Sequence, residues 1–426
     1  MSLIITTLVD YSTNFLNMII KTDQKVKYHI ISILKNKIFQ KMYKTHKDFI
    51  VNVLLHFLSI KGKINFLQLA RYSSLCEQTF RNNFEQDFDF LKFNKLLADQ
   101  IVSNECIVAF DPCYIPKSGK ETYGRAKFWS GSDKAAKWGL DICGFAVVDV
   151  IKNTAFHLKA FQTPGIKDRD DKFNLLLHYA SLVSKNAEVF KSISKYLVAD
   201  AFFSKKSFLD IILEINMHFI SRLRDDSVLM YIFKGELTGK KGRPKKFDGR
   251  IDIKNLNTNY FDKVICNQEL TIYSAIVYCK AFKRDIKLAV AVFSKDGKEV
   301  TRKLYFSTDL EQDALQIVPY YRSRFQIEFL YRDAKQHTGL TDCQARSENK
   351  LDFHFNTSLT AVNLAKFEWL SNSINEKTPF SMVNYKTLFN NTMMLDRFIC
   401  RFAINPNTAK NQKIYKELLI FGNIAA

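Results

Sequence analysis

The sequence predicts an α/β protein in which a mixed-sheet core is interrupted by a β-rich insertion and preceded by a helical region. Three observations support this class. Apolar residues recur at helical spacing early in the chain, short apolar runs then alternate with helical segments, and a second group of β-like runs follows. We divide the 426 residues into a helical region, a first core part, an insertion, a second core part and a helical tail, at 1–100, 101–225, 226–302, 303–370 and 371–426.

The N-terminal helical region contains the outline of a helix-turn-helix. Residues 26–60 place apolar side chains at helical spacing with Lys on the other side. An apolar segment, 64–72, is then followed by two serines and a second helix-compatible segment that carries Arg81. Such a second helix offers Arg and Asn side chains to base edges. Plain packing of a helical hairpin explains the same pattern, and both interpretations stay open.

The sequence of the first core part predicts strands and helices in a definite order. Apolar or alternating runs predict the strands, and Ser204 is expected to act as the N-cap of the helix that follows it. The expected elements are strands at 106–115, 138–150 and 154–164, a helix over 168–190, a strand at 196–203, a helix at 205–217 and a strand at 218–225. This order is also that of the ribonuclease-H-like fold.

The insertion contains three β-like runs, and the last of them is a candidate strand of the core sheet. These runs are 270–282, 286–294 and 303–308, and we then expect helices at 309–318 and 319–336, with Pro319 in a first helical turn. The insertion also contains KKGRPKK, centred on Arg243. Its Gly-Arg-Pro core between lysines resembles an AT-hook laid in a minor groove, although we prefer the interpretation of a basic, solvated loop that makes only nonspecific phosphate contacts.

The chain carries a large excess of positive charge. Lys and Arg total 63 against 43 Asp and Glu, for a net charge of +20. Nucleic acid is therefore the first candidate partner and an anionic membrane surface the second. No apolar stretch reaches membrane-spanning length, and the N-terminus lacks the basic start of a signal peptide. The cysteines form no CxxC pair, so we expect free thiols and a reducing, cytoplasmic location.

Two acids stand at the ends of apolar runs. Asp111 follows Ile107–Phe110, and Asp200 follows Tyr196–Ala199. Active sites of α/β sheets lie at the carboxyl ends of strands, although an acid there can also simply cap a strand or helix. Asp141 and Asp149 lie on nearby predicted strands and compete with Asp111 for the same role.

A third acid, Glu328, lies on a predicted helix among cations. At about 100° per residue, Tyr321, Arg324, Glu328 and Lys335 fall at roughly 0°, 300°, 340° and 320°, on one stripe about 60° wide. An acid beside two cations and a phenol suits a metal ion and DNA phosphates together. The alternative is a solvated helix face with an ordinary Arg–Glu pair.

The spacing Tyr-x2-Arg-x3-Glu-x6-Lys resembles the YREK signature of bacterial insertion-sequence transposases, in particular the insertion-sequence-four family. DPCYIPKSGK resembles the segment around the family's first Asp, and VADAFFSKKSF the segment around its second. The resemblance covers residues 64–370. It implies a ribonuclease-H-like core and assigns the three catalytic, metal-binding carboxylates to Asp111, Asp200 and Glu328.

The resemblance also implies cofactors, partners and contacts. Three such carboxylates would hold two Mg²⁺ ions, for which Mn²⁺ can substitute, in a site that cleaves and joins DNA. The partners would be double-stranded DNA, as transposon ends and target, with a homodimer in the DNA complex and no membrane. The DNA contacts would come from Tyr321, Arg324 and Lys335, with Lys117 and Lys120 as phosphate candidates that a solvated loop also explains. Some relatives hold a flipped base with a Trp of the insertion, but the insertion here contains no Trp.

The function expected from these features is that of a transposase which binds the terminal inverted repeats of its element and catalyses metal-dependent cleavage and strand transfer. Two alternatives remain: a transposase-derived DNA-binding protein without catalysis, and a nuclease of the ribonuclease-H-like fold. The three intact acids argue against the first alternative, and the YREK stripe with its long insertion argues against the second.

Overall fold

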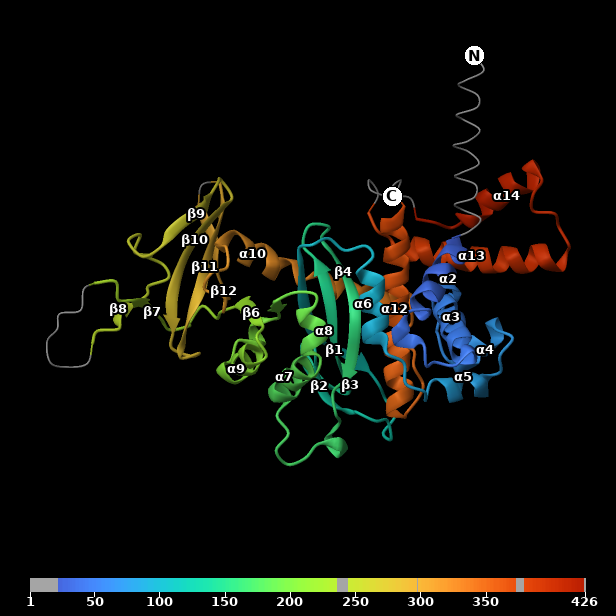
Figure 1. Ribbon diagram of the computed structural model, residues 1–426, viewed down its shortest axis with the longest axis horizontal. Coiled ribbons are helices and arrows are strands. Elements are labelled where there is room, and N and C mark those ends of the chain that lie inside the picture. The colour runs from blue at the N-terminus through green and yellow to red at the C-terminus, as the bar shows by residue number, and fades with distance from the viewer. Residues whose placement is uncertain (1–21, 236–243, 297, 373–378, 425–426) are drawn as a thin grey trace, which may run out of the picture.

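A twisted sheet runs through the centre of the molecule and carries the candidate acids (Figure 1). The structure is a computed structural model that describes residues 22–235, 244–296, 298–372 and 379–424. Its strands are β1 (Cys106–Pro116), β2 (Ala126–Ser130), β3 (Ala135–Asp149), β4 (Thr154–Gln162), β5 (Tyr196–Val198), β6 (His218–Arg222), β7 (Leu229–Ile232), β8 (Phe247–Arg250), β9 (Asp262–Cys266), β10 (Leu270–Cys279), β11 (Arg284–Lys295) and β12 (Lys298–Ser307).

These strands form one mixed sheet. Among the described residues the order is β2-β3-β1-β5-β6-β12-β11-β10-β7-β8, with β4 paired to β3 and β9 paired to β10. β1 runs antiparallel to β3 and parallel to β5, and β5 runs parallel to β6. The expectation of a mixed α/β protein with N-terminal helices is therefore confirmed.

Helices surround this sheet and precede it. They are α2 (Thr22–Leu34), α3 (Lys44–Ser59), α4 (Phe66–Tyr72), α5 (Glu77–Asn83), α6 (Phe90–Ala98), α7 (Leu175–Lys185), α8 (Ala187–Lys191), α9 (Lys206–Glu214), α10 (Ala314–Ser323), α11 (Gln326–His337), α12 (Glu348–Ser371), α13 (Met382–Arg401) and α14 (Ala409–Leu419), with short 3₁₀ turns η1 (Lys37–Phe39), η2 (Ile166–Asp168) and η3 (Ala201–Phe203). β3 is buried without alternation from Gly139 to Asp149, as expected for a strand covered on both faces. Figure 1 shows α7 and α9 on one side of the core strands and α6 and α12 on the other.

The long helix α12 closes the outer edge of β4. The Asn356 side chain accepts a hydrogen bond from the Ala160 backbone N–H and donates one to its carbonyl, at 2.8 and 3.0 Å. Asn363 does the same with the His157 backbone, at 2.8 Å in both directions. These amides take the place of a neighbouring strand, so the edge is left with no free row of donors and acceptors there.

The N-terminal helices share the apolar core with α12. Phe84 packs on Phe353 of α12 with ring centroids 4.4 Å apart, and Phe49 contacts both rings at 6.2 Å. α4 and α5 form the expected helical pair. The helical region is thus fixed to the core by aromatic packing.

The insertion continues the core sheet. β12 pairs with β11 on one side and with β6 on the other, so the run 303–308 does return to the core strands. β10 and β7 extend the sheet beyond β11, and Figure 1 shows these strands at one end of the long molecule.

Two local predictions were wrong near Asp200. The predicted strand 196–203 ends at Val198, and a 3₁₀ turn follows at Ala201–Phe203. The N-cap of α9 is Lys205 and not Ser204. The Ser204 hydroxyl donates instead to the Arg222 carbonyl at 3.0 Å. The chain turns earlier because Asp200 itself caps the short turn.

The two predicted helices 309–318 and 319–336 were also wrongly bounded. Asp313 caps a helix that starts at Ala314, because its carboxylate accepts the Leu315 N–H at 2.9 Å. Pro319 therefore lies inside α10 rather than in its first turn. Proline cannot donate to the Leu315 carbonyl, but Leu315 is exposed and water can satisfy that group. The helical path changes at Arg324, before α11.

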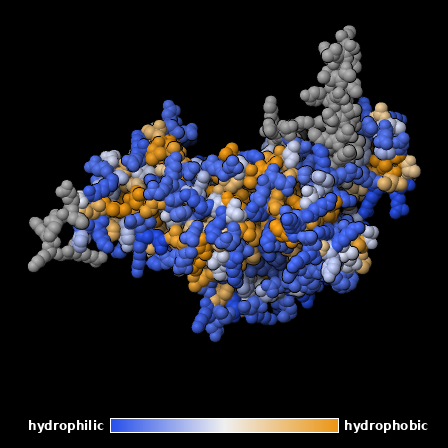
Figure 2. Space-filling model, in the orientation of Figure 1, coloured by the Kyte–Doolittle hydropathy of each residue, from blue (hydrophilic) through white to orange (hydrophobic). Residues whose placement is uncertain are grey.

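The C-terminal segment is helical, as expected, and α13 packs on α3. The buried Lys386 amine donates to the Phe57 carbonyl. Figure 2 shows hydrophobic side chains gathered near the end of the molecule that carries α14, where Phe398 and Phe402 are exposed. None of the helices within the described ranges has the length and apolarity that crossing a membrane requires.

Candidate active site

The strand register places Asp111 and Asp200 side by side. Ala109 of β1 pairs with Val198 of β5 in the parallel ladder, and each acid comes two residues later. Side chains two residues apart point to the same face, and neighbouring strands lie about 4.8 Å apart. Both acids therefore follow the carboxyl end of this pairing, and the charge of Asp200 acts on Asp111.

Asp200 stands where β5 stops. It is the N-cap of η3, and its carboxylate accepts the backbone N–H of Ala201. Asp200 remains exposed, so its second oxygen is open to a ligand.

Helix α11 is held on β1 by Tyr331. The Tyr331 hydroxyl donates to the Asp111 carbonyl at 2.5 Å and accepts the Gly144 N–H at 3.0 Å. Asp111 and Gly144 are partners across the β1–β3 ladder. A Cβ at Gly144 would lie 2.2 Å from the hydroxyl oxygen, so only glycine leaves room for this contact. The same helix carries Glu328, one turn before Tyr331.

Arg324 joins the first and third acids. One terminal nitrogen of its guanidinium lies 3.2 Å from Asp111 Oδ1, and the other lies 2.9 Å from Glu328 Oε1. The Arg324 side chain is only 11% exposed, against 21% for Asp111 and 37% for Glu328. Its buried Nε has no hydrogen-bond partner within the described part of the chain.

The electrostatics follow from this burial. Burial raises the pKa of Asp111 to about 7, with Arg324 opposing the rise and the charges of Glu328, Asp200 and Asp141 adding to it. Burial alone would lower the pKa of Arg324, but the two bound carboxylates raise it. The site therefore holds more negative charge than one guanidinium balances.

The competing acids are used elsewhere. Asp141 is buried and accepts hydrogen bonds from the hydroxyls of Thr163 and Tyr179, at 2.5 and 2.7 Å. Asp149 accepts the backbone N–H groups of Ser103 and Lys152. Of the three acids on these strands, Asp111 is the one directed at Arg324 and Glu328.

Arg222 belongs to the site, although the sequence analysis did not single it out. In β6, Ile220 pairs with Val198, so Arg222 and Asp200 each come two residues after the last pair of this parallel ladder. Arg222 also pairs with Tyr305 of β12, whose ring lies 5.0 Å from that of Tyr321. Its Nε is buried and lacks a partner among the residues described. The sequence feature that could have indicated Arg222 is the run HFISR, which ends in a cation.

Of the predicted phosphate contacts, one lies near Arg324 and two are exposed, namely Tyr321, Lys335 and Lys120, whereas Lys117 is half-buried. Tyr321 lies near Arg324, with 6.0 Å between its ring centroid and the guanidinium carbon, and Lys335 donates to the Tyr114 carbonyl at 3.0 Å while remaining exposed. Lys120 is exposed on the loop after β1. Lys117 is half-buried and donates to the Cys343 carbonyl, and burial lowers its pKa.

The remaining predicted DNA contacts lie far from the acids in sequence. Arg81 of α5 is half exposed, binds Glu77 at 2.5 Å and lies over the Phe66 ring at 4.8 Å. Arg243 lies outside the described residues, as do the first three residues of the KKGRPKK run that precede it.

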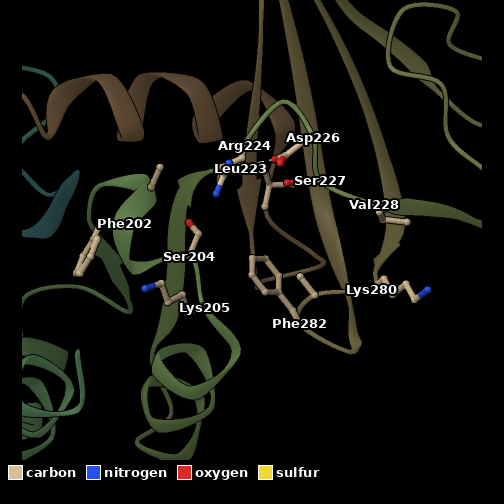
Figure 3. A pocket seen from close by; sticks show the side chains of 12 residues that line it. Phe202, Ser204, Lys205, Leu223, Arg224, Asp226, Ser227, Val228, Lys280 and Phe282 are labelled. Carbon is tan, nitrogen blue, oxygen red and sulfur yellow. Dashed lines mark ion pairs between the residues drawn. The ribbon is translucent and has the colours of Figure 1, made fainter. Parts of the chain in front are cut away.

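A pocket of about 660 Å³ opens beside the segment that follows Asp200. Figure 3 shows Phe202 and Lys205 on one side of it, Lys280 and Phe282 on the other, and Arg224 paired with Asp226. Cations on both sides make this a favourable surface for a polyanion.

The donor set suits Mg²⁺. Within the described ranges no group of three or more His, Cys, Asp and Glu side chains is close enough to hold a metal ion, and the Arg324 guanidinium lies between two of the candidate acids. All three candidate donors are nevertheless carboxylates, which supply the oxygen ligands that Mg²⁺ takes, and a guanidinium already binds two of them. Asp111, Asp200 and Glu328 therefore fit a divalent ion chemically.

Comparison with known families agrees with this chemistry. Residues 182–364 match the family described as Transposase DDE domain, and no curated protein matches the chain. The matched segment contains Asp200 and Glu328 and begins after Asp111. Such a domain implies DNA transposition, DNA as a partner and, as is typical of these enzymes, divalent metal ions.

Proposed function

We propose that the chain is a transposase of the insertion-sequence-four type, with a ribonuclease-H-like core, that binds the terminal inverted repeats of its element. It cleaves DNA there and transfers the freed strand to a target. The observation that carries this proposal is that Arg324 binds Asp111 and Glu328 together, beside the β1–β5 pairing that Asp200 follows.

Asp111, Asp200 and Glu328 would hold two Mg²⁺ ions, or Mn²⁺ in their place. Bound there, the ions would supply Lewis-acid activation of the attacking oxygen and stabilisation of the leaving one in an in-line displacement. Tyr331 fixes the Asp111 backbone against α11, so Glu328 is presented to Asp111 from a rigid helix. Arg324 keeps the two carboxylates close before DNA arrives.

The surrounding cations would hold the DNA backbone. Arg222, at the end of β6, and Arg324, between two of the acids, supply guanidinium charge that would attract phosphate oxygens. Tyr321 and the exposed Lys335 extend this surface along the helices. We expect two copies of the chain to hold two element ends in the complex, at the nucleoid of a bacterial cell.

The test is cleavage of a terminal inverted repeat duplex in Mg²⁺. Asp111→Ala, Asp200→Ala and Glu328→Ala should each lower cleavage at least about a hundredfold, while DNA binding in EDTA persists. Asp225→Ala is the matched control, since Asp225 is exposed and lies three residues after Arg222. Cleavage that survived in all three variants would remove the basis of the assignment.

The products separate the proposal from its alternatives. A transposase joins the cleaved 3′-OH end to target DNA, whereas a nuclease of the same fold releases the ends without joining them. A DNA-binding derivative binds the repeats and neither cuts nor joins in any divalent metal. Light scattering of the protein–DNA complex would test the expected dimer.

A further inference from the structure

The β2–β3 hairpin carries an exposed aromatic and cationic face that the proposed chemistry does not use. Lys127 lies opposite Trp138 in the ladder, and Trp129 lies opposite Ala136. Directly opposed residues share a face, so both tryptophans point to the same side. Trp129 is 66% exposed and Trp138 is 45% exposed.

The other face of the hairpin is packed. Phe128 is buried, and the Arg169 guanidinium lies over its ring at 5.5 Å. At the tip, Asp133 accepts the Ser130 hydroxyl at 2.7 Å and binds Lys137 at 2.6 Å. The hairpin is therefore a fixed platform, and the exposure of its tryptophans does not come from loose packing.

Cations bracket the exposed rings. The Arg125 guanidinium lies over Trp138 at 4.6 Å, and the Lys127 amine lies 5.8 Å from the same ring. Lys134 at the turn adds one more positive charge, and Asp133, the one acid between residues 125 and 138, is paired with Lys137 of the opposite face. Aromatic rings beside cations are how proteins bind single-stranded nucleic acid, since bases stack on the rings while the cations meet phosphates.

This face is continuous with the candidate active site. The Tyr114 hydroxyl donates to the Trp138 carbonyl at 2.8 Å, and the Tyr114 carbonyl accepts from Lys335 at 3.0 Å. β3, which carries Trp138, also carries Gly144, the ladder partner of Asp111. DNA that reaches Lys335 thus passes close to the hairpin.

We propose that the β2–β3 hairpin binds unpaired nucleotides next to the cleavage point, with Trp129 stacking on a base and Lys127 meeting the backbone. The inference rests on DNA being the substrate, as proposed above. It requires unpaired bases, because the bases of an intact duplex are already stacked on one another. It assigns the exposed tryptophans a role in holding the opened DNA end.

Fluorescence can report on Trp129 directly, because the chain has three tryptophans. The variant Trp138→Phe/Trp369→Phe keeps Trp129 as the one indole. We expect an oligothymidine of about 15 nucleotides to quench its emission in EDTA, and a blunt duplex with the same number of phosphates to quench it much less. Equal quenching by both, or none by either, would overturn the proposal.

Affinity measurements supply the second test. Trp129→Ala should weaken oligothymidine binding about tenfold without changing its salt dependence, whereas Lys127→Ala should lower the salt slope by about 0.7. Phe402→Ala, at a residue that is 68% exposed on the far helical segment, is the matched control and should change neither. Thermal denaturation of the Trp129 variant should match the parent, since the side chain is mostly exposed.

The outcomes separate this inference from the proposed function. If Trp129→Ala binds oligothymidine as the parent does while Mg²⁺-dependent cleavage proceeds, the hairpin proposal fails and the catalytic one stands. If the parent never cleaves but Trp129 is quenched as expected, the hairpin proposal stands and the catalytic one fails. If Trp129→Ala instead dissociates a dimer in light scattering, the face is a subunit contact and the proposal is wrong.

Discussion

Replacing Gly144 by Ala should disable the candidate site without touching any of its charged groups. The added Cβ would stand 2.2 Å from the Tyr331 hydroxyl oxygen, where ordinary contacts begin at 3.4 Å. Tyr331 must therefore retreat by about 1 Å, and α11 with Glu328 must follow or lose its bond to the Asp111 carbonyl.

The magnitude can be worked from that displacement. Overpacking of this kind destabilises a protein by roughly 1–3 kcal/mol. A misplacement of about 1 Å in a catalytic group lowers the rate about a hundredfold. We therefore expect Gly144→Ala to fold, to unfold at lower urea concentration, and to cleave about a hundredfold more slowly than the parent.

A double-mutant cycle isolates the cause. Tyr331→Phe removes the hydroxyl and costs about 1–2 kcal/mol, because the Gly144 N–H and the Asp111 carbonyl lose their partner. In Gly144→Ala/Tyr331→Phe the nearest ring atom is then 3.0 Å from the new Cβ, so most of the clash is gone. The two changes should be less than additive in urea denaturation and in cleavage rate. Strict additivity, or a Gly144→Ala variant as active as the parent, would refute the reasoning.

Three further changes test other parts of the structure. Burial lowers the pKa of Lys386 to about 7 from 10.5, so the folded chain binds fewer protons than the unfolded chain between these values and its stability rises with pH. Between pH 7 and 9.5 the rise should be about 3 kcal/mol. Lys386→Met should flatten this slope in urea denaturation at the two pH values, and an unchanged slope would contradict the assignment. Arg222→Gln should weaken binding of cleaved DNA ends and reduce its salt slope by about one, with the exposed Arg401→Gln as the control, and equal effects in the two variants would argue against a special role for Arg222. Asp141→Asn should lower the free energy of unfolding by about 1–3 kcal/mol, because the Tyr179 hydroxyl loses a charged acceptor. The rate of cleavage per folded molecule should not change. Loss of cleavage would make Asp141 a candidate catalytic acid again.

Local signals in the sequence were sufficient for the strands that carry the acids. The apolar runs before Asp111 and Asp200 are short and continuous, as in strands buried on both faces, and they do form β1 and β5. The runs themselves do not specify which strand pairs with which. That Ala109 lies beside Val198 depends on contacts between distant parts of the chain, so the proximity of the two acids could be expected only through a family resemblance.

The errors have local physical causes. Ser204 has the chemistry of an N-cap, but its hydroxyl finds the Arg222 carbonyl instead, and a cap preference is weaker than a tertiary hydrogen bond already in place. Pro319 suits a first turn, yet Asp313 begins the helix earlier. Arg222 was missed because a cation at a strand end carries no distinctive local pattern until its neighbours are known.

The position of β12 has a consequence for how the chain folds during synthesis. β3, β1 and β5 can pair as soon as they leave the ribosome, but β6 lacks its second neighbour until Tyr305 has been made, after the whole insertion. Until then β6 is an open edge with unpaired backbone groups, which is where nascent chains aggregate or pair wrongly. Pairing between segments so far apart in sequence is intrinsically slow. Completion of the insertion should therefore be the step that commits this chain to its native sheet, and ribosome-bound chains that end before β12 should be more sensitive to protease than chains that include it.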